Sequence, residues 1–315
     1  MKRICPILTL LFLLTFMSGA AAQVGGTWQT MAPMPTARQE LATAALNGKI
    51  YAIGGYNSSG MPTNIVEVYD PPTNTWSSAH PIPFPLHHNS AAVAAGKLYS
   101  FGGPSTLAFV YDELSDSWSA VASTLFFHAL TPAVGVFNDK IYVAGGANGG
   151  GGNSMENAVE VYDPVANTWT ALHPMKTGRN HCGGAFIDGK FYVVGGRRRV
   201  HALDANEAYD PQTDTWTRQA PLPTARGGIG VAAVNGELFV FGGETLFPNG
   251  GGEVHGEVEV FDPATNTWES LSPMPDPRHG IWASVIGNQI FLPGGGTVSG
   301  FGGTTNLNTV FTVSP

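Results

Sequence analysis

The stretch Lys49-Ile50-Tyr51-Ala52-Ile53-Gly54-Gly55 decides the fold of this 315-residue chain. It is a short apolar run, rich in β-branched and aromatic side chains, and two glycines end it. Such a run predicts a buried strand that stops abruptly. Similar runs end in Gly-Gly at 102–103, 145–146, 195–196, 242–243 and 294–295, a mean spacing of 48 residues. This regular recurrence identifies a repeat protein.

Two further marks recur at fixed distances. An aromatic-Asp pair precedes a tryptophan, and the step from the aromatic residue to the tryptophan is seven residues in all five instances. The tryptophans are Trp28, Trp76, Trp118, Trp169, Trp216 and Trp268. From tryptophan to the next Gly-Gly the step is 26 or 27 residues, whereas from Gly-Gly to the aromatic residue it ranges from 9 to 19. Nearly all length variation therefore falls in one segment per repeat.

Each repeat resolves into four predicted strands, named a to d. Strand a, residues 40–46 in the first copy, leads through the Asn47-Gly48 turn into strand b. Asn-Gly favours a tight hairpin, and strand b ends at the Gly-Gly pair. Strand c, residues 65–69, alternates like a half-buried strand. Strand d carries the tryptophan, whose N–H needs a partner if the ring is buried.

The order Gly-Gly, Tyr-Asp-Pro, Asn-Thr-Trp, Met-Pro and Arg resembles the kelch repeat, in six copies between about residues 24 and 313. The kelch family implies an all-β, six-bladed β-propeller with four antiparallel strands in each blade. Four copies carry an arginine before strand a, at Arg38, Arg179, Arg226 and Arg278, and we expect these side chains to tie blades together. The second and third copies have Leu86 and Ala129 there.

The two ends of the chain predict how the ring closes. Trp28 has no strand a, b or c before it, and the last copy ends at residues 309–313 without a tryptophan. We therefore expect the Trp28 strand to complete the blade that begins at Arg278, so that no wide sheet edge is exposed. Deleting residues 24–32 should then collapse the fold.

The first 22 residues have the pattern of a signal peptide. Lys2 and Arg3 precede an apolar run from Ile7 to Met17, and small residues at Ala20 and Ala22 suit cleavage before Gln23. The predicted propeller then spans residues 23–315. The protein is expected to be secreted or periplasmic, without stable membrane insertion after cleavage, because the apolar run is too short to span comfortably.

Composition narrows the classes of partner. The formal net charge of −8 argues against nucleic acid, because phosphate binding needs a basic surface. Cys182 is the only cysteine left after cleavage, so an internal disulfide is excluded and a buried small residue is expected there.

Strand alternation places the start of every strand a and every b–c loop on one face, where functional variety is expected. The candidate ligand-binding residues on that face share polar or aromatic side chains near the axis. They are Gln39, Glu40, Tyr56, His87, His88, Asn180, His181, Arg197, Arg198, Arg199, Glu244 and His279.

Three interpretations of these residues remain open. They line a water-filled channel without a ligand, they bind a carbohydrate or protein ligand, or they form a catalytic or metal site. In the second, residues 197–199 would offer forked arginine donors to a carboxylate. In the third, Glu40, His88 and His181 would supply metal ligands or acid–base groups. No local ligand spacing supports a metal, so no metal or other cofactor is expected.

Some kelch-like propellers are enzymes, namely copper radical oxidases resembling galactose oxidase and periplasmic sialic acid mutarotases. The oxidase needs a Cys–Tyr crosslink with Tyr and His copper ligands, and no matching motif surrounds Cys182. The mutarotase fits in architecture and compartment, but this chain lacks long insertions. The sequence therefore predicts an exported binding protein for a carbohydrate or protein ligand. A secreted sugar-active enzyme is the alternative, with no catalytic residues identified.

Overall fold

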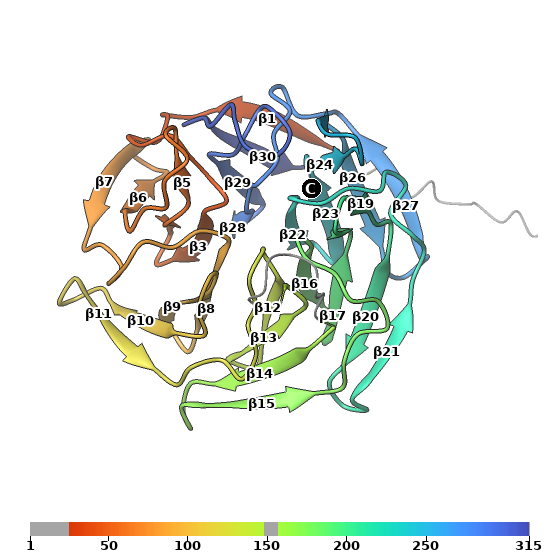
Figure 1. Ribbon diagram of the computed structural model, residues 1–315, viewed down its shortest axis with the longest axis horizontal. Coiled ribbons are helices and arrows are strands. Elements are labelled where there is room, and N and C mark those ends of the chain that lie inside the picture. The colour runs from red at the N-terminus through yellow and green to blue at the C-terminus, as the bar shows by residue number, and fades with distance from the viewer. Residues whose placement is uncertain (1–24, 148–156, 315) are drawn as a thin grey trace, which may run out of the picture.

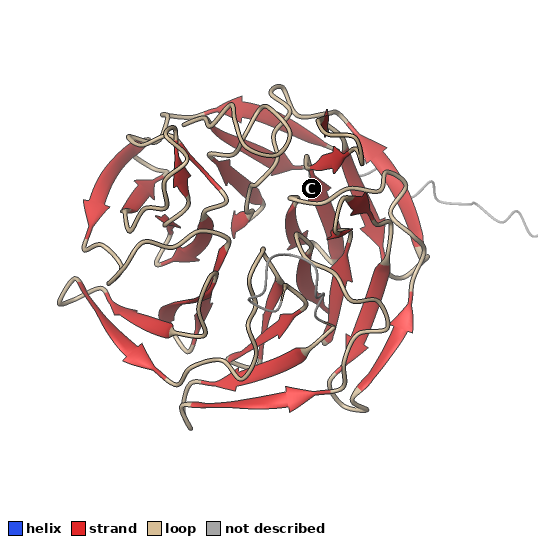
Figure 2. Ribbon diagram, in the orientation of Figure 1, coloured by secondary structure: helices blue, strands red, loops and turns tan. Residues whose placement is uncertain are grey.

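The computed structural model describes residues 25–147 and 157–314, which form a closed ring of six four-stranded antiparallel sheets (Figure 1). All regular structure in these residues is strand (Figure 2). The predicted six-bladed propeller is thus confirmed. The signal peptide predicted at residues 1–22 lies outside the described residues. In the part of the chain that the structure describes, no helix is long and apolar enough to cross a membrane.

Each blade runs from an inner strand a at the axis to an outer strand d (Figure 1). Blade one is β3 (Ala42–Leu46), β4 (Lys49–Ile53), β6 (Val66–Asp70) and β7 (Thr75–Ala79); blade two is β8 (Asn89–Ala94), β9 (Lys97–Gly102), β10 (Ala108–Asp112) and β11 (Ser117–Val121). Blade three is β12 (Ala133–Phe137), β13 (Lys140–Ala144), β14 (Val159–Asp163) and β15 (Thr168–Leu172); blade four is β16 (Gly183–Ile187), β17 (Lys190–Val194), β20 (Asn206–Asp210) and β21 (Thr215–Arg218).

Blade five is β22 (Gly230–Val234), β23 (Glu237–Phe241), β26 (Val258–Asp262) and β27 (Thr267–Leu271); blade six is β28 (Ser284–Ile286), β29 (Gln289–Pro293), β30 (Asn308–Val313) and β1 (Gly26–Thr30). Three blades each carry an additional pair of short strands. They are β2 (Arg38–Gln39) with β5 (Tyr56–Asn57), β18 (Arg197–Arg198) with β19 (His201–Ala202), and β24 (Glu244–Leu246) with β25 (Gly252–Val254).

The ring closes by joining the two ends of the described chain in one sheet. β1 pairs with β30 over five residues, and Trp28 lies opposite Phe311. The Trp28 ring also packs against Phe241, with ring centroids 5.8 Å apart. The predicted completion of the last blade by the Trp28 strand is confirmed.

The recurring tryptophan joins each blade to the one before it. Trp76 donates its indole N–H to the Ala32 carbonyl oxygen at 2.8 Å. Asn74 accepts the Ala32 N–H at 2.8 Å and the Tyr69 hydroxyl at 2.7 Å. The pairs Trp118–His80, Trp169–Ala122, Trp216–His173 and Trp268–Ala220 repeat this contact. The seven-residue step from aromatic to tryptophan is therefore the span of a c–d hairpin that holds the neighbouring blade.

The repeated arginines act inside their own blades. Arg38 is fully buried and donates to the Gly54 oxygen at 2.8 Å, the Ile65 oxygen at 3.0 Å and Glu67 at 2.8 Å. These bonds join the ends of strands b and c of blade one. The link to the neighbouring blade is made by the backbone instead, because Gly295 N–H donates to the Arg38 carbonyl oxygen at 2.8 Å. The expectation that the arginine side chains tie blades together was wrong on this point.

Blade three uses a histidine in place of the arginine. His128 is fully buried and occupies the arginine position, because Ala129 bridges Ala147 as Asn180, the residue after Arg179, bridges Arg197; the expectation that Ala129 stands at the arginine position was wrong. Its Nδ1 lies 2.6 Å from the Gly145 oxygen and its Nε2 lies 2.8 Å from Glu160. Gly145 and Glu160 correspond to Gly54 and Glu67 of blade one. The third repeat therefore keeps the polar link between the ends of strands b and c, with the shorter histidine side chain in place of arginine.

Candidate functional site

Six residues, one from each blade, form a ring around the axis at the start of the inner strands. All six adopt a left-handed backbone conformation, with φ between +50° and +68°. They are Glu40, His88, Thr131, His181, Gly228 and Gly280, and we refer to them as the axial ring. Such a φ is costly for residues other than glycine, asparagine and aspartate. Four of the six positions nevertheless carry larger side chains.

Backbone hydrogen bonds link the axial ring around the axis. His88 N–H donates to the Glu40 oxygen at 2.8 Å, and Glu40 N–H donates to the Gly280 oxygen at 2.9 Å. Gly280 N–H donates to Gly228, which donates to His181. Blade three departs from the pattern, since His181 N–H donates to the Leu130 oxygen rather than to Thr131. These five bonds connect the six blades in series and hold the backbone that carries the side chains of the axial ring.

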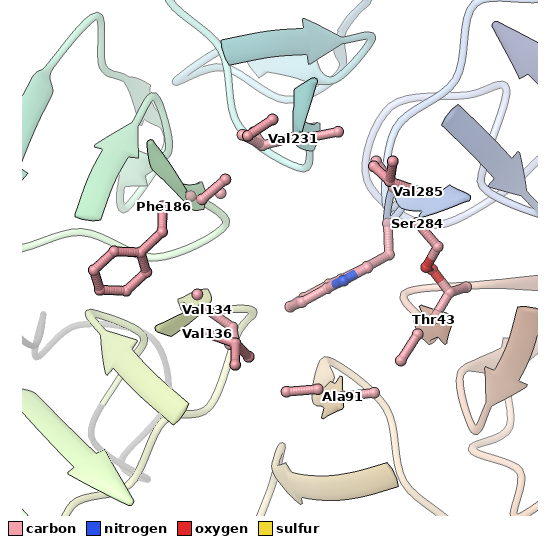
Figure 3. A pocket seen from close by; sticks show the side chains of 18 of the residues that line it. Thr43, Ala91, Val134, Val136, Phe186, Val231, Ser284 and Val285 are labelled. Atoms are coloured by element: carbon pink, nitrogen blue, oxygen red, sulfur yellow. The ribbon is translucent and has the colours of Figure 1, made fainter. Parts of the chain in front are cut away.

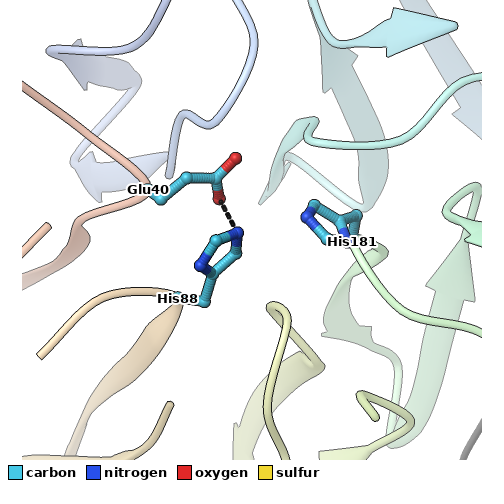
Figure 4. Close-up of side chains that lie close together, drawn as sticks. All are labelled: Glu40, His88 and His181. Carbon is cyan, nitrogen blue, oxygen red and sulfur yellow. Dashed lines mark ion pairs between the residues drawn. The ribbon is translucent and has the colours of Figure 1, made fainter. Parts of the chain in front are cut away.

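The side chains of Glu40, His88 and His181 converge over the axial ring (Figure 4). Glu40 Oε2 lies 3.3 Å from His88 Nε2 and accepts the Thr131 hydroxyl at 3.3 Å. The His88 and His181 rings meet edge to face at 5.0 Å. Three blades that are distant in sequence thus contribute to one buried polar cluster.

Loops of blades four, five and six complete this cluster. Arg197 donates to His181 Nε2 at 2.7 Å and forms an ion pair with Glu244. Glu244 also accepts the Gly300 N–H at 2.6 Å. His279 Nε2 lies 2.9 Å from the Val298 carbonyl oxygen, while its Nδ1 lies 3.5 Å from Glu244. The polar cluster is therefore covered by b–c loops, and most of its polar groups bond to one another.

Burial sets the charge state of the cluster. It raises the pKa of Glu40, and it lowers the pKa of His88 to about 3. Burial also lowers the pKa of His87 to about 4 and that of His181 well below its usual range. All three imidazoles are therefore neutral near pH 7.

The lowered histidine pKa values predict a loss of stability on acidification. Between about pH 3 and pH 6.5 these three histidines bind fewer protons in the folded protein than in the unfolded chain, so their contribution to stability is present above pH 6.5 and is lost as the pH drops. The raised pKa of Glu40 has the opposite effect on stability, because this carboxyl group binds a proton more readily in the folded protein. It is a single group, whereas three histidines have lowered pKa values. For His88 alone, we expect about 2 kcal/mol to be lost between pH 6.5 and 5.

Urea unfolding at several pH values measures this dependence. The His88→Gln variant should show a shallower fall in unfolding free energy below pH 6.5 than the parent protein. His173→Gln, which changes an exposed histidine, should leave the slope unchanged. A parent protein whose stability is constant from pH 7 to 5 would contradict the buried neutral imidazoles.

The cluster meets some of the requirements of a metal site. Ligand atoms of Glu40, His88 and His181 lie within 4.8 Å of one another, and neutral imidazole is the form that binds zinc or copper. However, both nitrogens of His181 are engaged, Nδ1 with Asn180 Oδ1 at 2.7 Å and Nε2 with Arg197. A cation at this place would have to displace the arginine. Of the three side chains only Glu40 and His88 pair with each other, while the nitrogens of His181 are bonded to Asn180 and Arg197.

Ten of the twelve candidate residues either form this cluster or lie next to it. Gln39 and His279 both lie against Gly296, and Tyr56 stacks on His87 at 4.3 Å. Arg198 and Arg199 are exposed and stand apart, whereas Arg197 turns inward to Glu244. The expected fork of three adjacent arginines for one carboxylate is not formed, because the first already holds a buried partner.

Two features of the molecule were missed by sequence reasoning. The first is a set of exposed apolar side chains on the face of the b–c loops and the loops that enter strand a: Met61, Leu107, Leu125, Phe127, Phe247, Val298 and Phe301. Among the described residues, the other large hydrophobic side chains that are exposed are Leu114 and Val165, which lie on c–d turns. The second is Trp282, which lines a central cavity. Both lie outside the regular marks of the repeat.

The ring closure and the inter-blade contacts define a six-bladed β-propeller built from tandem repeats. Residues 108–296 match the family model described as "KLHDC2/KLHL20/DRC7 Kelch-repeats domain", and residues 37–81 match the "Kelch motif". The chain therefore belongs to the kelch-repeat family.

Curated relatives and a solved structure agree with this assignment. The chain is 30% identical to Kelch-like protein terF of Aspergillus terreus over 289 residues, which cover 84% of this chain and 62% of that protein. It is 31% identical to human Kelch-like protein 38 over 177 residues, covering 54% and 29% of the two chains. The chain thus spans less than two thirds of the relatives' length. The solved structure titled "Structure of YjhT" shares the fold, with a TM-score of 0.76, 17% identity, and coverage of 90% of this chain and 99% of that one.

Proposed function

We propose that this kelch propeller is an exported interaction protein that binds a protein partner through the face of its b–c loops. The observation that carries the proposal is the gathering of exposed apolar side chains on this face. Phe301 is 72% exposed and Met61 is 60% exposed. Exposed aromatic residues and methionine are characteristic of protein interfaces. The opposite face carries only two such residues in the described parts of the chain.

The same geometry favours a protein over a carbohydrate ligand. A sugar needs accessible donors and acceptors for its hydroxyl groups. Seven of the twelve residues expected to supply them are buried, with His279 fully so, whereas Arg198 and Arg199 are exposed. Within the buried set, His181 and Glu244 are both bonded to Arg197. The same face exposes seven large apolar side chains, one of which, Phe301, contacts Tyr56 edge to face at 5.3 Å. Export is part of the proposal and depends on the signal-peptide pattern of residues 1–22.

Affinity capture with this protein, from the exported proteins of the host, tests whether a protein partner binds to this face. Replacing Met61, Phe247 and Phe301 together by serine should abolish capture of the partner, because loss of one interface hot spot costs about 2 kcal/mol or more. The matched control is Leu114→Ser with Val165→Ser, which removes exposed apolar side chains from the opposite face. Partner binding that survives the triple substitution, or a specific glycan-array signal without any protein partner, would overturn the proposal.

Mass spectrometry of the exported protein should find Gln23 at its N-terminus.

A further inference from the structure

A central cavity lies below the axial ring, between the inner strands of all six blades. Its volume is about 400 Å³. Thr43, Ala91, Val134, Val231 and Ser284 lie around this cavity (Figure 3). This volume falls in the range of small-molecule sites, roughly 300 to 1,000 Å³. The cavity is separate from the polar cluster, which sits on the other side of the axial ring.

The lining combines apolar side chains with backbone hydrogen-bonding groups. Small residues predominate on β3, β8, β16 and β22, and the hydroxyls of Thr43 and Ser284 bond to each other at 2.7 Å. Each inner strand pairs with only one neighbour, so its second edge faces the channel. Such an edge offers unpaired N–H and C=O groups. A ligand would therefore meet apolar walls interrupted by backbone donors and acceptors.

One side chain breaks the pattern of small residues. Four positions after the arginine site, five blades have Ala42, Ser90, Ala133, Gly183 and Gly230, whereas blade six has Trp282. Trp282 is the only tryptophan outside the repeat marks. It precedes β28, which has three residues where the other inner strands have five or six. Its indole lines the cavity and remains partly exposed.

The access route follows from burial. The residues of the axial ring that carry large side chains, Glu40, His88, Thr131 and His181, are buried. Lining residues are partly exposed along the whole inner strands, with Gly183 and Trp282 beside the axial ring and Ala45, Val136 and Val285 nearer the a–b turns. Since the side chains of the axial ring are buried and cover one end, we infer that the cavity opens on the face of the a–b turns. A ligand would enter from the face opposite to the proposed partner surface.

We propose that this cavity binds a small aromatic molecule that carries hydroxyl groups. The Trp282 indole supplies a surface on which a ring can stack, and the free strand edges supply partners for hydroxyl groups. The competing occupant is water, of which the cavity would hold about 13 molecules at roughly 30 Å³ each. An aromatic ligand would release most of this water while keeping backbone hydrogen bonds at its polar edge.

Titration calorimetry of the full-length protein with 2-naphthol tests the proposal. We expect saturable binding of one molecule per chain, with quenching of tryptophan fluorescence. Trp282→Ala removes the stacking surface, and Ala233→Phe fills the channel from a lining position on β22; each should weaken binding about tenfold or more. Trp282→Phe should retain most of the affinity. Naphthalene, which lacks the hydroxyl, should bind more weakly.

The matched control is Ala171→Phe, the same substitution at an exposed position on the outer strand β15. It should bind 2-naphthol like the parent protein. Absence of saturable binding to the parent protein would show that the cavity holds water only, which overturns the proposal. Binding that is unchanged in both Trp282→Ala and Ala233→Phe would place the probe elsewhere and also overturn it. Partner capture through the b–c loops is measured independently, so failure of one proposal leaves the other intact.

Discussion

A protein that lacks residues 24–32 is expected to be unfolded or aggregated at 25 °C. These residues contain β1, which supplies the outer strand of blade six and joins both ends of the described chain in one sheet. Without it, β30 becomes an open edge and Phe311 and Phe241 lose the Trp28 ring that covers them. Trp76 also loses its carbonyl partner, Ala32. Together these losses approach the total stability of a typical domain, about 5–15 kcal/mol.

Point variants separate the parts of this effect. Trp28→Ala should cost about 2–4 kcal/mol, at the lower end of the range for large aromatic residues because the ring is only half-buried. Gln29→Ala, on the exposed side of the same strand, should change the unfolding free energy by less than about 0.5 kcal/mol. Thermal and urea unfolding followed by circular dichroism measures all three proteins. A truncated protein with an unchanged melting curve would refute closure by the N-terminal strand.

The fold was predictable because the marks of the repeat are the groups that make the inter-blade contacts. The spacing of Tyr69 and Trp76 is the length of the hairpin that holds Ala32, so the same spacing must recur wherever a blade joins another. The unpaired Trp28 predicted ring closure for the same reason. The third repeat was misaligned because it has one extra residue before its inner strand: Ala129 bridges Ala147 as Asn180 bridges Arg197, so His128 and not Ala129 occupies the arginine position. The sequence held a signal of this, since the step from Trp118 to Gly145 is 27 residues where the other repeats have 26.

The candidate site was predictable in its location but not in its internal bonding. Counting back from the a–b turns identified Glu40, His88 and His181 as neighbours, because the three residues occupy equivalent positions in their blades. The sequence could not show that Arg197 would turn inward to Glu244, because that choice depends on the packing of two loops from different blades. Trp282 did leave a signal: it is the large residue at a position where five blades have small ones.

Replacing Arg38 by methionine is expected to destabilise the protein by about 3–5 kcal/mol, because it leaves Glu67 buried without its partner. Methionine keeps much of the volume of the side chain but offers no donors to the Gly54 and Ile65 oxygens. Adding Glu67→Leu should restore part of the loss, since a buried carboxylate no longer needs compensation. Urea unfolding of the two single variants and the double variant gives the coupling energy of the pair.

Blade six supplies an internal control for the carboxylate in this experiment. Arg278 is buried like Arg38 and donates to backbone oxygens, among them those of Leu292 and Gly294, but its side-chain partner is the Thr309 hydroxyl, at 2.5 Å, where Arg38 has a carboxylate. Arg278→Met therefore removes equivalent backbone hydrogen bonds without leaving a charge behind, and it should cost less than Arg38→Met by at least about 1 kcal/mol. Equal losses at the two sites would mean that the arginines stabilise their blades through the carbonyl groups alone. A larger loss at Arg38 would assign the difference to the buried Glu67 carboxylate, which that arginine must neutralise.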